Sequence, residues 1–94
     1  MVTIKRMASG AKVFYIAMDG EREAGLMATT PMGPDKFSID HTEVEKDYEG
    51  KGVGKQLVLA AVADAREHHQ RVVLYCPFAK VLFKRDPSLQ DVLS

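Results

Sequence analysis

The chain has 94 residues, of which 46% are hydrophobic and 28% are charged, a composition typical of a globular domain. Thirteen basic residues balance thirteen acidic ones, which excludes an overall field that would attract nucleic acid or an anionic membrane. We therefore expect a single domain over residues 1–94, with neither nucleic acid nor membrane as a partner.

The first half of the chain predicts antiparallel strands. A short edge strand at residues 2–6 precedes a strand of β-branched and aromatic residues at 12–18, which the dipeptide DG ends in a tight turn. The return strand covers residues 21–30, and a loop with two prolines and a glycine leads to a strand at 36–45. These segments favour a meander in which each strand pairs with the next.

The second half switches to a helical period. After three closely spaced glycines, apolar residues recur at i, i+3, i+4 and i+7, namely Val58, Ala61, Val62 and Ala65. Residues 71–75 read as a short buried strand, Pro77 can begin a helix over 78–85, and a final short turn follows. The pattern predicts an α+β fold: antiparallel strands, a β-α-β crossover to a parallel strand, and a C-terminal helix.

The stretch EKDYEGKGVGKQL, residues 45–57, predicts an anion site. Its glycines lie at a helix N-terminus, where backbone N–H groups have no helical partner and no Ser, Thr or Asn is placed to cap them. Glu49 and Gln56 exclude a P-loop, and the spacing G-x-G-x-G excludes a dinucleotide fingerprint. The alternative is a glycine-rich turn before a solvated helix start.

Two segments resemble the motifs of the GNAT acyltransferases. VEKDYEGKGVGKQLV is similar to the acetyl-CoA motif V-x-P-x-Y-R-G-x-G-[IV]-[GA]-x-x-L, and CPFAKVLF is similar to the second motif N-x-x-A-x-x-L-Y. The first motif is matched at Val44, Tyr48, Gly50, Gly52, Val53, Gly54 and Leu57, and the second at Ala79 and Leu82. The chain most resembles a subgroup of very small GNAT-like proteins with a C-P-[FY]-A-K motif.

The resemblance implies a minimal GNAT-like fold and an N-acetyltransferase that takes acetyl-CoA as cosubstrate, needs no metal, and acetylates an amine. It implies that loop N–H groups bind the CoA pyrophosphate, and that an N–H near Val44 or Glu45 polarises the thioester carbonyl. The coenzyme-binding residues so implied are Val44, Glu45, Glu49, Gly50, Lys51, Gly52, Val53, Gly54, Lys55, Pro77, Lys80, Phe83 and Lys84. For Lys80 and Lys84, a contact with the 3′-phosphate and a solvated basic face are equal alternatives.

Three departures from the family pattern bear on activity. Glu49 replaces the usual Arg or Gln beside the pyrophosphate, where Lys51 and Lys55 can compensate its charge. Phe83 replaces the tyrosine that often protonates the leaving thiolate, and the helices that precede the second strand in full-length members are missing. An open acceptor side suits a peptide or protein amine. It equally suits the alternative function, a non-catalytic module that binds CoA or acyl-CoA.

The candidate catalytic residues are Cys76, His41 and Glu43. Cys76 lies between a strand end and Pro77, where a helix N-terminus favours the thiolate, so an acetylated cysteine intermediate is one interpretation and simple packing is the other. His41 is expected on the strand face that carries Ile39 and Glu43, where it could act as a base or be a structural histidine.

Cys76 is the single cysteine, so the chain forms no internal disulfide. The first eleven residues lack the apolar run of a signal peptide, and the longest apolar run, residues 57–63, is too short to span a bilayer. These features predict a reducing intracellular compartment, the cytoplasm.

Overall fold

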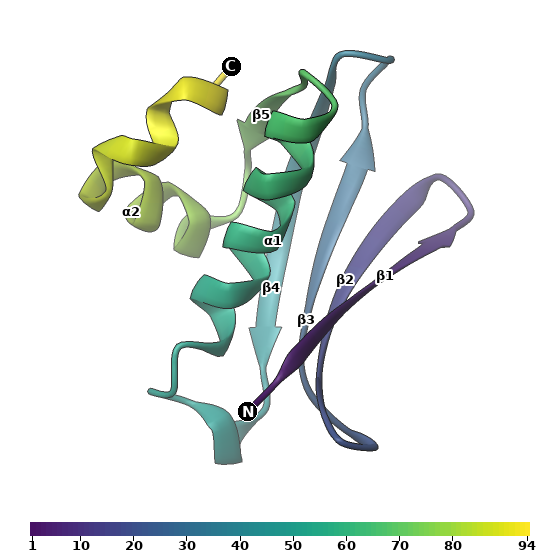
Figure 1. The fold of residues 1–94 in the computed structure, drawn as a ribbon, viewed down its shortest axis with the longest axis vertical. Helices are drawn as coiled ribbons and strands as arrows, with labels where there is room; N and C mark the ends of the chain where they lie inside the picture. The colour runs from purple at the N-terminus through teal and green to yellow at the C-terminus, as the bar shows by residue number, and fades with distance from the viewer.

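Five strands form one sheet in the computed structural model, which describes residues 1–94 (Figure 1). The sheet has the order β1-β2-β3-β4-β5, with neighbours antiparallel from β1 to β4 and β5 parallel to β4. The strands are β1 (Thr3–Ser9), β2 (Lys12–Asp19), β3 (Arg22–Pro31), β4 (Lys36–Val44) and β5 (Arg71–Leu74). The predicted α+β fold, with a meander followed by one parallel crossover, is confirmed.

The first strand is longer than its sequence predicts. Residues 2–6 were expected to form a short edge strand, whereas β1 pairs with β2 along its whole length, from Thr3 opposite Met18 to Ser9 opposite Lys12. Gly10 makes the turn between them in the left-handed region, at φ 61°. The pairing with β2 supplies the hydrogen bonds that the weak strand propensity of KRMAS does not indicate.

Helix α1 (Val53–Glu67) crosses over between β4 and β5 and contacts all five strands. The residues that give it its period, Val58, Ala61, Val62 and Ala65, are all buried, as predicted. Gly25 on β3 admits the helix closely, since a Cβ there would lie 3.1 Å from the Val53 side chain and 2.9 Å from the Glu43 carbonyl oxygen. The start of α1 is thereby held against the ends of β3 and β4.

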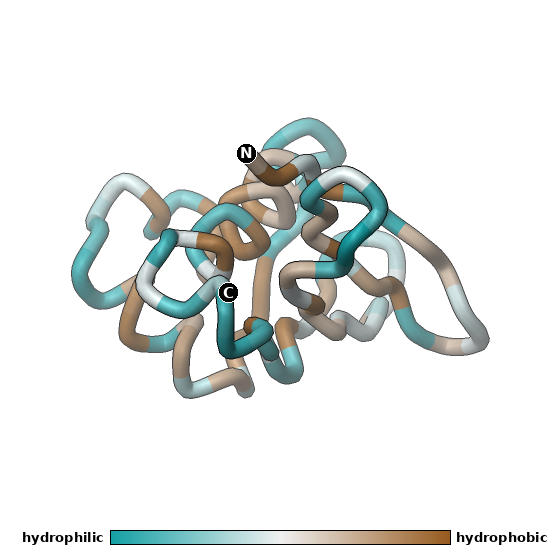
Figure 2. Tube along the Cα trace, turned by 90° about the horizontal axis from the view of Figure 1, so that it is seen from below, coloured by the Kyte–Doolittle hydropathy of each residue, from teal (hydrophilic) through white to brown (hydrophobic).

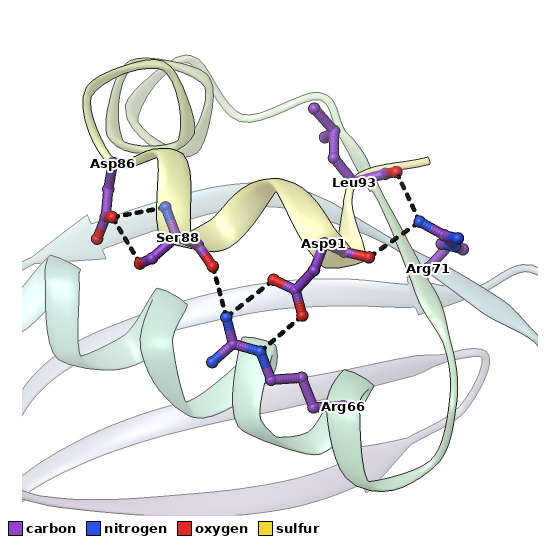
Figure 3. A network of polar contacts seen from close by, with 6 residues as sticks. All are labelled: Arg66, Arg71, Asp86, Ser88, Asp91 and Leu93. Atoms are coloured by element: carbon purple, nitrogen blue, oxygen red, sulfur yellow. Dashed lines mark hydrogen bonds and ion pairs between the residues drawn. The ribbon is translucent and has the colours of Figure 1, made fainter.

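The C-terminal elements, α2 (Pro77–Arg85) and the 3₁₀ turn η2 (Pro87–Val92), lie beyond β5 at the edge of the sheet (Figure 1). Two arginines fix η2, as Figure 3 shows. Arg66 of α1 binds both carboxylate oxygens of Asp91, at 3.0 and 2.9 Å, and the Ser88 carbonyl at 2.7 Å. Arg71 of β5 donates to the Asp91 and Leu93 carbonyls. The final turn is therefore fastened to both α1 and β5.

A β-bulge in β4 reverses part of the expected face assignment. Ala28 of β3 pairs with His41, but the next residue, Thr29, pairs with Ile39, so Asp40 is an extra residue. Ile39 is fully buried while His41 is exposed. The prediction that His41 shares a face with Ile39 is wrong, because one inserted residue moves the following side chains to the other face.

The carboxylate of Asp40 stabilises this bulge. It accepts hydrogen bonds from the hydroxyls of Ser38 (2.6 Å) and Thr30 (2.5 Å) and from the Lys12 ammonium (3.0 Å). Desolvation favours the protonated acid, but these three hydrogen bonds outweigh it and lower the pKa of Asp40 below its ordinary value. The Asp40 carboxylate thus connects strands β2, β3 and β4.

Buried apolar side chains from the sheet, both helices and η2 form one core cluster. In Figure 2 the hydrophilic turns lie at the periphery and several hydrophobic segments lie nearer the middle. None of the helices combines the length and apolar character needed to cross a membrane.

Candidate functional site

The largest cavity, about 700 Å³, lies where the end of β4, the start of α1 and one side of α2 meet. Its walls combine backbone-rich, charged and apolar portions. Its lining residues are Thr42, Val44, Tyr48, Glu49, Gly50, Gly52, Val53, Gly54, Lys55, Phe78 and Leu82. A cavity of this size, with a polar end and an apolar end, suits a ligand with both characters.

The polar end consists of free amides at the N-terminus of α1. Gly52 is the N-cap at φ 78°, and no side chain caps the helix. The first amide bonded back along the chain is that of Gln56, which donates to the Gly52 carbonyl at 3.0 Å. The amides of Val53, Gly54 and Lys55 therefore have no acceptor, and with the positive end of the helix dipole they form a site suited to an anion.

Glycine is needed at the three positions of the loop for different physical reasons. Gly50 and Gly52 adopt φ values of 76° and 78° with open space around them, so glycine is needed there for backbone conformation. Gly54 lies inside the first turn of α1, where a Cβ would come within 2.9 Å of the Phe78 ring. At Gly54 the missing side chain therefore leaves room for an aromatic ring.

The apolar end is formed where β4 and β5 separate. Their pairing ends at Ile39 and Leu74, after which the amides of Tyr75 and Cys76 both donate to the Ile39 carbonyl. Strand β4 continues to Val44 without β5 beside it. The gap leaves this edge of β4 open toward the cavity.

Cys76 lies behind the cavity wall. It is 2% exposed, does not line the cavity, and its thiol donates a hydrogen bond to the hydroxyl of Thr42 at 3.5 Å. Thr42 itself lines the cavity. This placement agrees with the packing interpretation, because Thr42 lies between the buried sulfur and the cavity.

The other two catalytic candidates lie on the opposite face of β4. Thr42 and Val44 line the cavity, so His41 and Glu43, which alternate with them, point to the other side, where both are exposed. The structure therefore does not bring His41 or Glu43 together with Cys76.

Several predicted coenzyme contacts do not line the cavity. Phe83 is 1% exposed and belongs to the core, while the side chains of Lys80 and Lys84 are exposed. On α2 the cavity is lined instead by Phe78 and Leu82, one turn apart, and residues two positions further along point away from it. The expected contacts absent from the lining are Glu45, Lys51, Pro77, Lys80, Phe83 and Lys84.

Four lining residues were missed by sequence reasoning. Thr42 could have been found from its alternation with Val44, and Phe78 with Leu82 from their i, i+4 spacing. Tyr48 and Leu82 were noted only as motif matches. The Tyr48 hydroxyl donates to Asp19 at 2.6 Å, and this hydrogen bond is the main cause that raises the pKa of Tyr48. No three His, Cys, Asp or Glu side chains are grouped so that they could hold a metal ion.

Comparison with known proteins identifies one family. The model described as GCN5-related N-acetyl-transferase matches residues 13–92. Among solved structures, a GCN5-like protein from Staphylococcus aureus is 28% identical, with a TM-score of 0.73 over 96% of this chain and 87% of that one. A comparison with curated proteins found no match.

Two further structures carry the coenzyme. A GNAT family acetyltransferase from Elizabethkingia anophelis with acetyl-CoA bound is 15% identical, with a TM-score of 0.67 over 78% of this chain and 63% of that one. An acetyltransferase from Bacillus subtilis in complex with CoA is 19% identical, with a TM-score of 0.67 over 79% of this chain and 64% of that one. The chain thus spans less than two thirds of these two proteins, and at this identity the likeness shows the fold.

Proposed function

The chain belongs to the family of GCN5-related N-acetyltransferases, and from this premise we propose that it transfers the acetyl group of acetyl-CoA to an amine. The observation that carries the proposal is the cavity itself. It joins three unbonded amides at the N-terminus of α1 to an open edge of β4, which are the features a diphosphate and an extended thioester arm require.

We assign the pyrophosphate to the polar end of the cavity. The free amides of Val53, Gly54 and Lys55 would bind its oxygens, and the Lys55 side chain adds a positive charge. Glu49 also lines this end and opposes the ligand charge. Because backbone donors outnumber the one repelling carboxylate, binding is weakened by Glu49 and not abolished.

The pantetheine arm would then run along the open edge of β4 toward Thr42. Successive amides of a strand point to opposite sides, and that of Glu45 donates to Ala24 of β3 at 2.9 Å. The Val44 amide therefore points to the side where β5 has diverged. Of the two amides expected to polarise the thioester carbonyl, we assign the role to Val44, since Glu45 is already bonded.

We propose direct transfer. The amine nitrogen attacks the thioester carbon, the C–N bond forms and the C–S bond breaks. The CoA thiolate takes, through water, the proton that the attacking nitrogen loses. The acceptor reaches the gap between β4 and β5 from the face where His41 and Glu43 are exposed, so either can take the ammonium proton. A peptide or protein amine fits this open approach.

The alternative is a non-catalytic module that binds CoA or acyl-CoA. One observation favours it: Phe83, which stands where the family motif has the tyrosine that often protonates the leaving thiolate, is a buried core residue without a hydroxyl. A cavity that supplies no side-chain proton donor for the leaving thiolate favours holding the ligand over turning it over.

One set of measurements tests the proposal. We expect CoA binding by calorimetry and amine-dependent release of free thiol from acetyl-CoA with peptides that carry an α-amine or a lysine. Binding without thiol release for any amine would favour the binding module, and no binding would refute both.

Cys76 is tested separately. Direct transfer predicts that Cys76→Ala keeps the rate of acetylation and that no acetyl group appears on Cys76 in the wild-type protein by peptide mass spectrometry. A hydroxylamine-sensitive adduct on Cys76, lost together with activity in Cys76→Ala and Cys76→Ser, would replace direct transfer by the covalent route.

A further inference from the structure

We propose that the turn between β2 and β3 positions the glycine loop, residues 50–55, for its ligand. Tyr48 is the positioning residue. The inference rests on the proposed function, since it concerns the loop to which we assign the pyrophosphate. We call the four residues that make the connection, Asp19, Arg22, Asp47 and Tyr48, the turn clamp.

The turn clamp consists of two contacts between distant parts of the chain. The Tyr48 hydroxyl donates to the Asp19 carboxylate at 2.6 Å, and the Arg22 guanidinium donates to the Asp47 carboxylate at 2.7 Å. Asp19 is the last residue of β2 and Arg22 the first of β3, so both sides of the turn reach the same short segment. That segment is η1 (Lys46–Tyr48), which only Glu49 separates from the first glycine of the loop, Gly50.

The glycine loop has few other anchors. None of the residues of η1 is buried, and Tyr48 is half-buried against the core. The backbone hydrogen bonds of the segment are local, and the one nearest the glycines, from the Lys51 amide to the Tyr48 carbonyl, is long at 3.4 Å. With glycines at left-handed φ values and no side-chain cap, the loop depends on side chains outside it for its position.

Two positively charged side chains lie near the Tyr48 ring. The Arg22 guanidinium lies 5.1 Å and the Lys51 ammonium 5.7 Å from the ring centroid. The two carboxylates of the turn clamp hold the tyrosine and the arginine in place, while Lys51 stays free of any ion pair. A ring fixed by Asp19 therefore keeps the Lys51 ammonium beside Tyr48, although Lys51 itself does not line the cavity.

A loop that is already fixed binds its ligand more tightly, because binding then does not have to include the entropy cost of ordering the loop. Tyr48→Phe removes only the hydroxyl and keeps the ring. We expect it to weaken CoA binding about two- to tenfold, the range for one hydrogen bond. Binding of pantetheine, which lacks the pyrophosphate, should stay unchanged in a chemical-shift titration. Hydrogen exchange of the amides at 50–55 should become faster, with β3 and β4 unaffected.

The chain offers a matched control and a rescue. Tyr75→Phe makes the same chemical change on a tyrosine that is 59% exposed and whose hydroxyl makes no hydrogen bond. It should leave CoA affinity and loop exchange as in the wild type. Asp19→Ala should reproduce Tyr48→Phe and add nothing to it in the double variant, while Asp19→Asn, which keeps an acceptor, should restore much of the affinity.

Each outcome decides between the two proposals. If the wild-type protein binds CoA and Tyr48→Phe binds it equally well with unchanged loop exchange, the positioning role is refuted and the proposed function stands. If Tyr48→Phe weakens CoA and pantetheine alike and lowers the unfolding temperature, the contact merely stabilises the fold, and the positioning role is again refuted. If the wild-type protein does not bind CoA, the proposed function fails and the positioning role falls with it.

Discussion

At the residue scale, the glycines of the loop show how one residue type answers different needs. Gly50 and Gly52 supply left-handed backbone at the helix start, whereas Gly54 leaves space for the Phe78 ring. Each reason predicts a different response to alanine.

Gly52→Ala should be destabilising by about 1–2 kcal/mol, because an L-residue with a Cβ is strained at φ 78° although nothing crowds it. Since Gly52 is the N-cap of α1, the strain should also displace the free amides and weaken CoA binding. Urea unfolding and calorimetry measure the two effects. A variant as stable as the wild type with unchanged CoA affinity would show that the loop tolerates a side chain.

The effect of Gly54→Ala on the free energy of unfolding should depend on the Phe78 ring. In a Phe78→Ala background the substitution should stabilise the protein by up to about 1 kcal/mol, the gain in helix propensity. In the wild-type background the ring, 2.9 Å from the new methyl group, must move, and the gain should be reduced or reversed. A double-mutant cycle by urea unfolding reveals the coupling, and additive effects would mean that the ring does not resist the methyl group.

Glu49→Gln should tighten CoA binding by a few-fold at most, since an exposed charge pair contributes only about 0.2–1 kcal/mol. Glu49 lines the cavity beside the free amides, so removing its charge relieves repulsion of the pyrophosphate. Raising the ionic strength should shrink the gain. Calorimetry at low and high salt makes the test, and a gain that ignores salt would assign the effect to another cause.

At the scale of elements, the bulge in β4 decides which side chains face the cavity. The extra residue, Asp40, shifts the alternation so that Thr42 and Val44 share the face of Ile39, while His41 and Glu43 point the other way. The polar contacts of Asp40 with Ser38, Thr30 and Lys12 hold this arrangement.

Asp40→Asn should lower stability at neutral pH by about 1 kcal/mol, the order of a hydrogen bond to a partly exposed charge. The pKa of Asp40 is lowered in the folded protein, so its contribution is present above the unfolded pKa of about 4 and is lost as the pH falls through the lower folded pKa. The difference in free energy of unfolding between Asp40→Asn and the wild type should therefore become smaller below about pH 4.

Urea unfolding at several pH values measures this difference. Asp35→Asn, on an exposed loop aspartate whose side chain makes no hydrogen bond, is the matched control and should show little effect at any pH. If the free energies of unfolding of Asp40→Asn and the wild type differ by the same amount at neutral and acid pH, the carboxylate charge does not stabilise the bulge.

At the scale of the whole molecule, the candidate site joins the start of α1, the end of β4 and one side of α2. All three elements pack on the one core cluster, so a ligand in the cavity is linked to global stability. We also expect one cooperative unfolding transition, as the predicted single domain over residues 1–94 requires.

CoA at ten times its Kd should stabilise the protein by about 1.4 kcal/mol and raise the unfolding temperature by about 6–11 °C for a chain of this size. Thermal scans over a CoA series measure the shift. Pantetheine at the same concentrations is the control and should give a much smaller shift, because it lacks the group that the α1 N-terminus binds. Equal shifts for the two ligands would contradict the pyrophosphate assignment.

Much of this molecule follows from local sequence patterns. Alternating β-branched residues, the DG turn, the period of Val58, Ala61, Val62 and Ala65, and Pro77 at the start of α2 all predict elements that the structure contains. These signals are readable because each depends on backbone preference or on burial of one face. The glycine motif likewise placed its glycines at a helix N-terminus, and the family match confirms the resemblance to GNAT proteins.

What the sequence could not decide depends on contacts between residues far apart in the chain. The bulge at Asp40, which places His41 on the opposite face from Ile39, arises from pairing with β3 and leaves no local signal. The ring that fills the space at Gly54, the burial of Cys76 behind Thr42 and the bond between Tyr48 and Asp19 are set by the packing of α2 and the β2–β3 turn. The sequence alone determined which elements form and in what order, because those follow from neighbours along the chain. Only the tertiary structure decided which side chains face the cavity, because that depends on register and on the packing of distant elements.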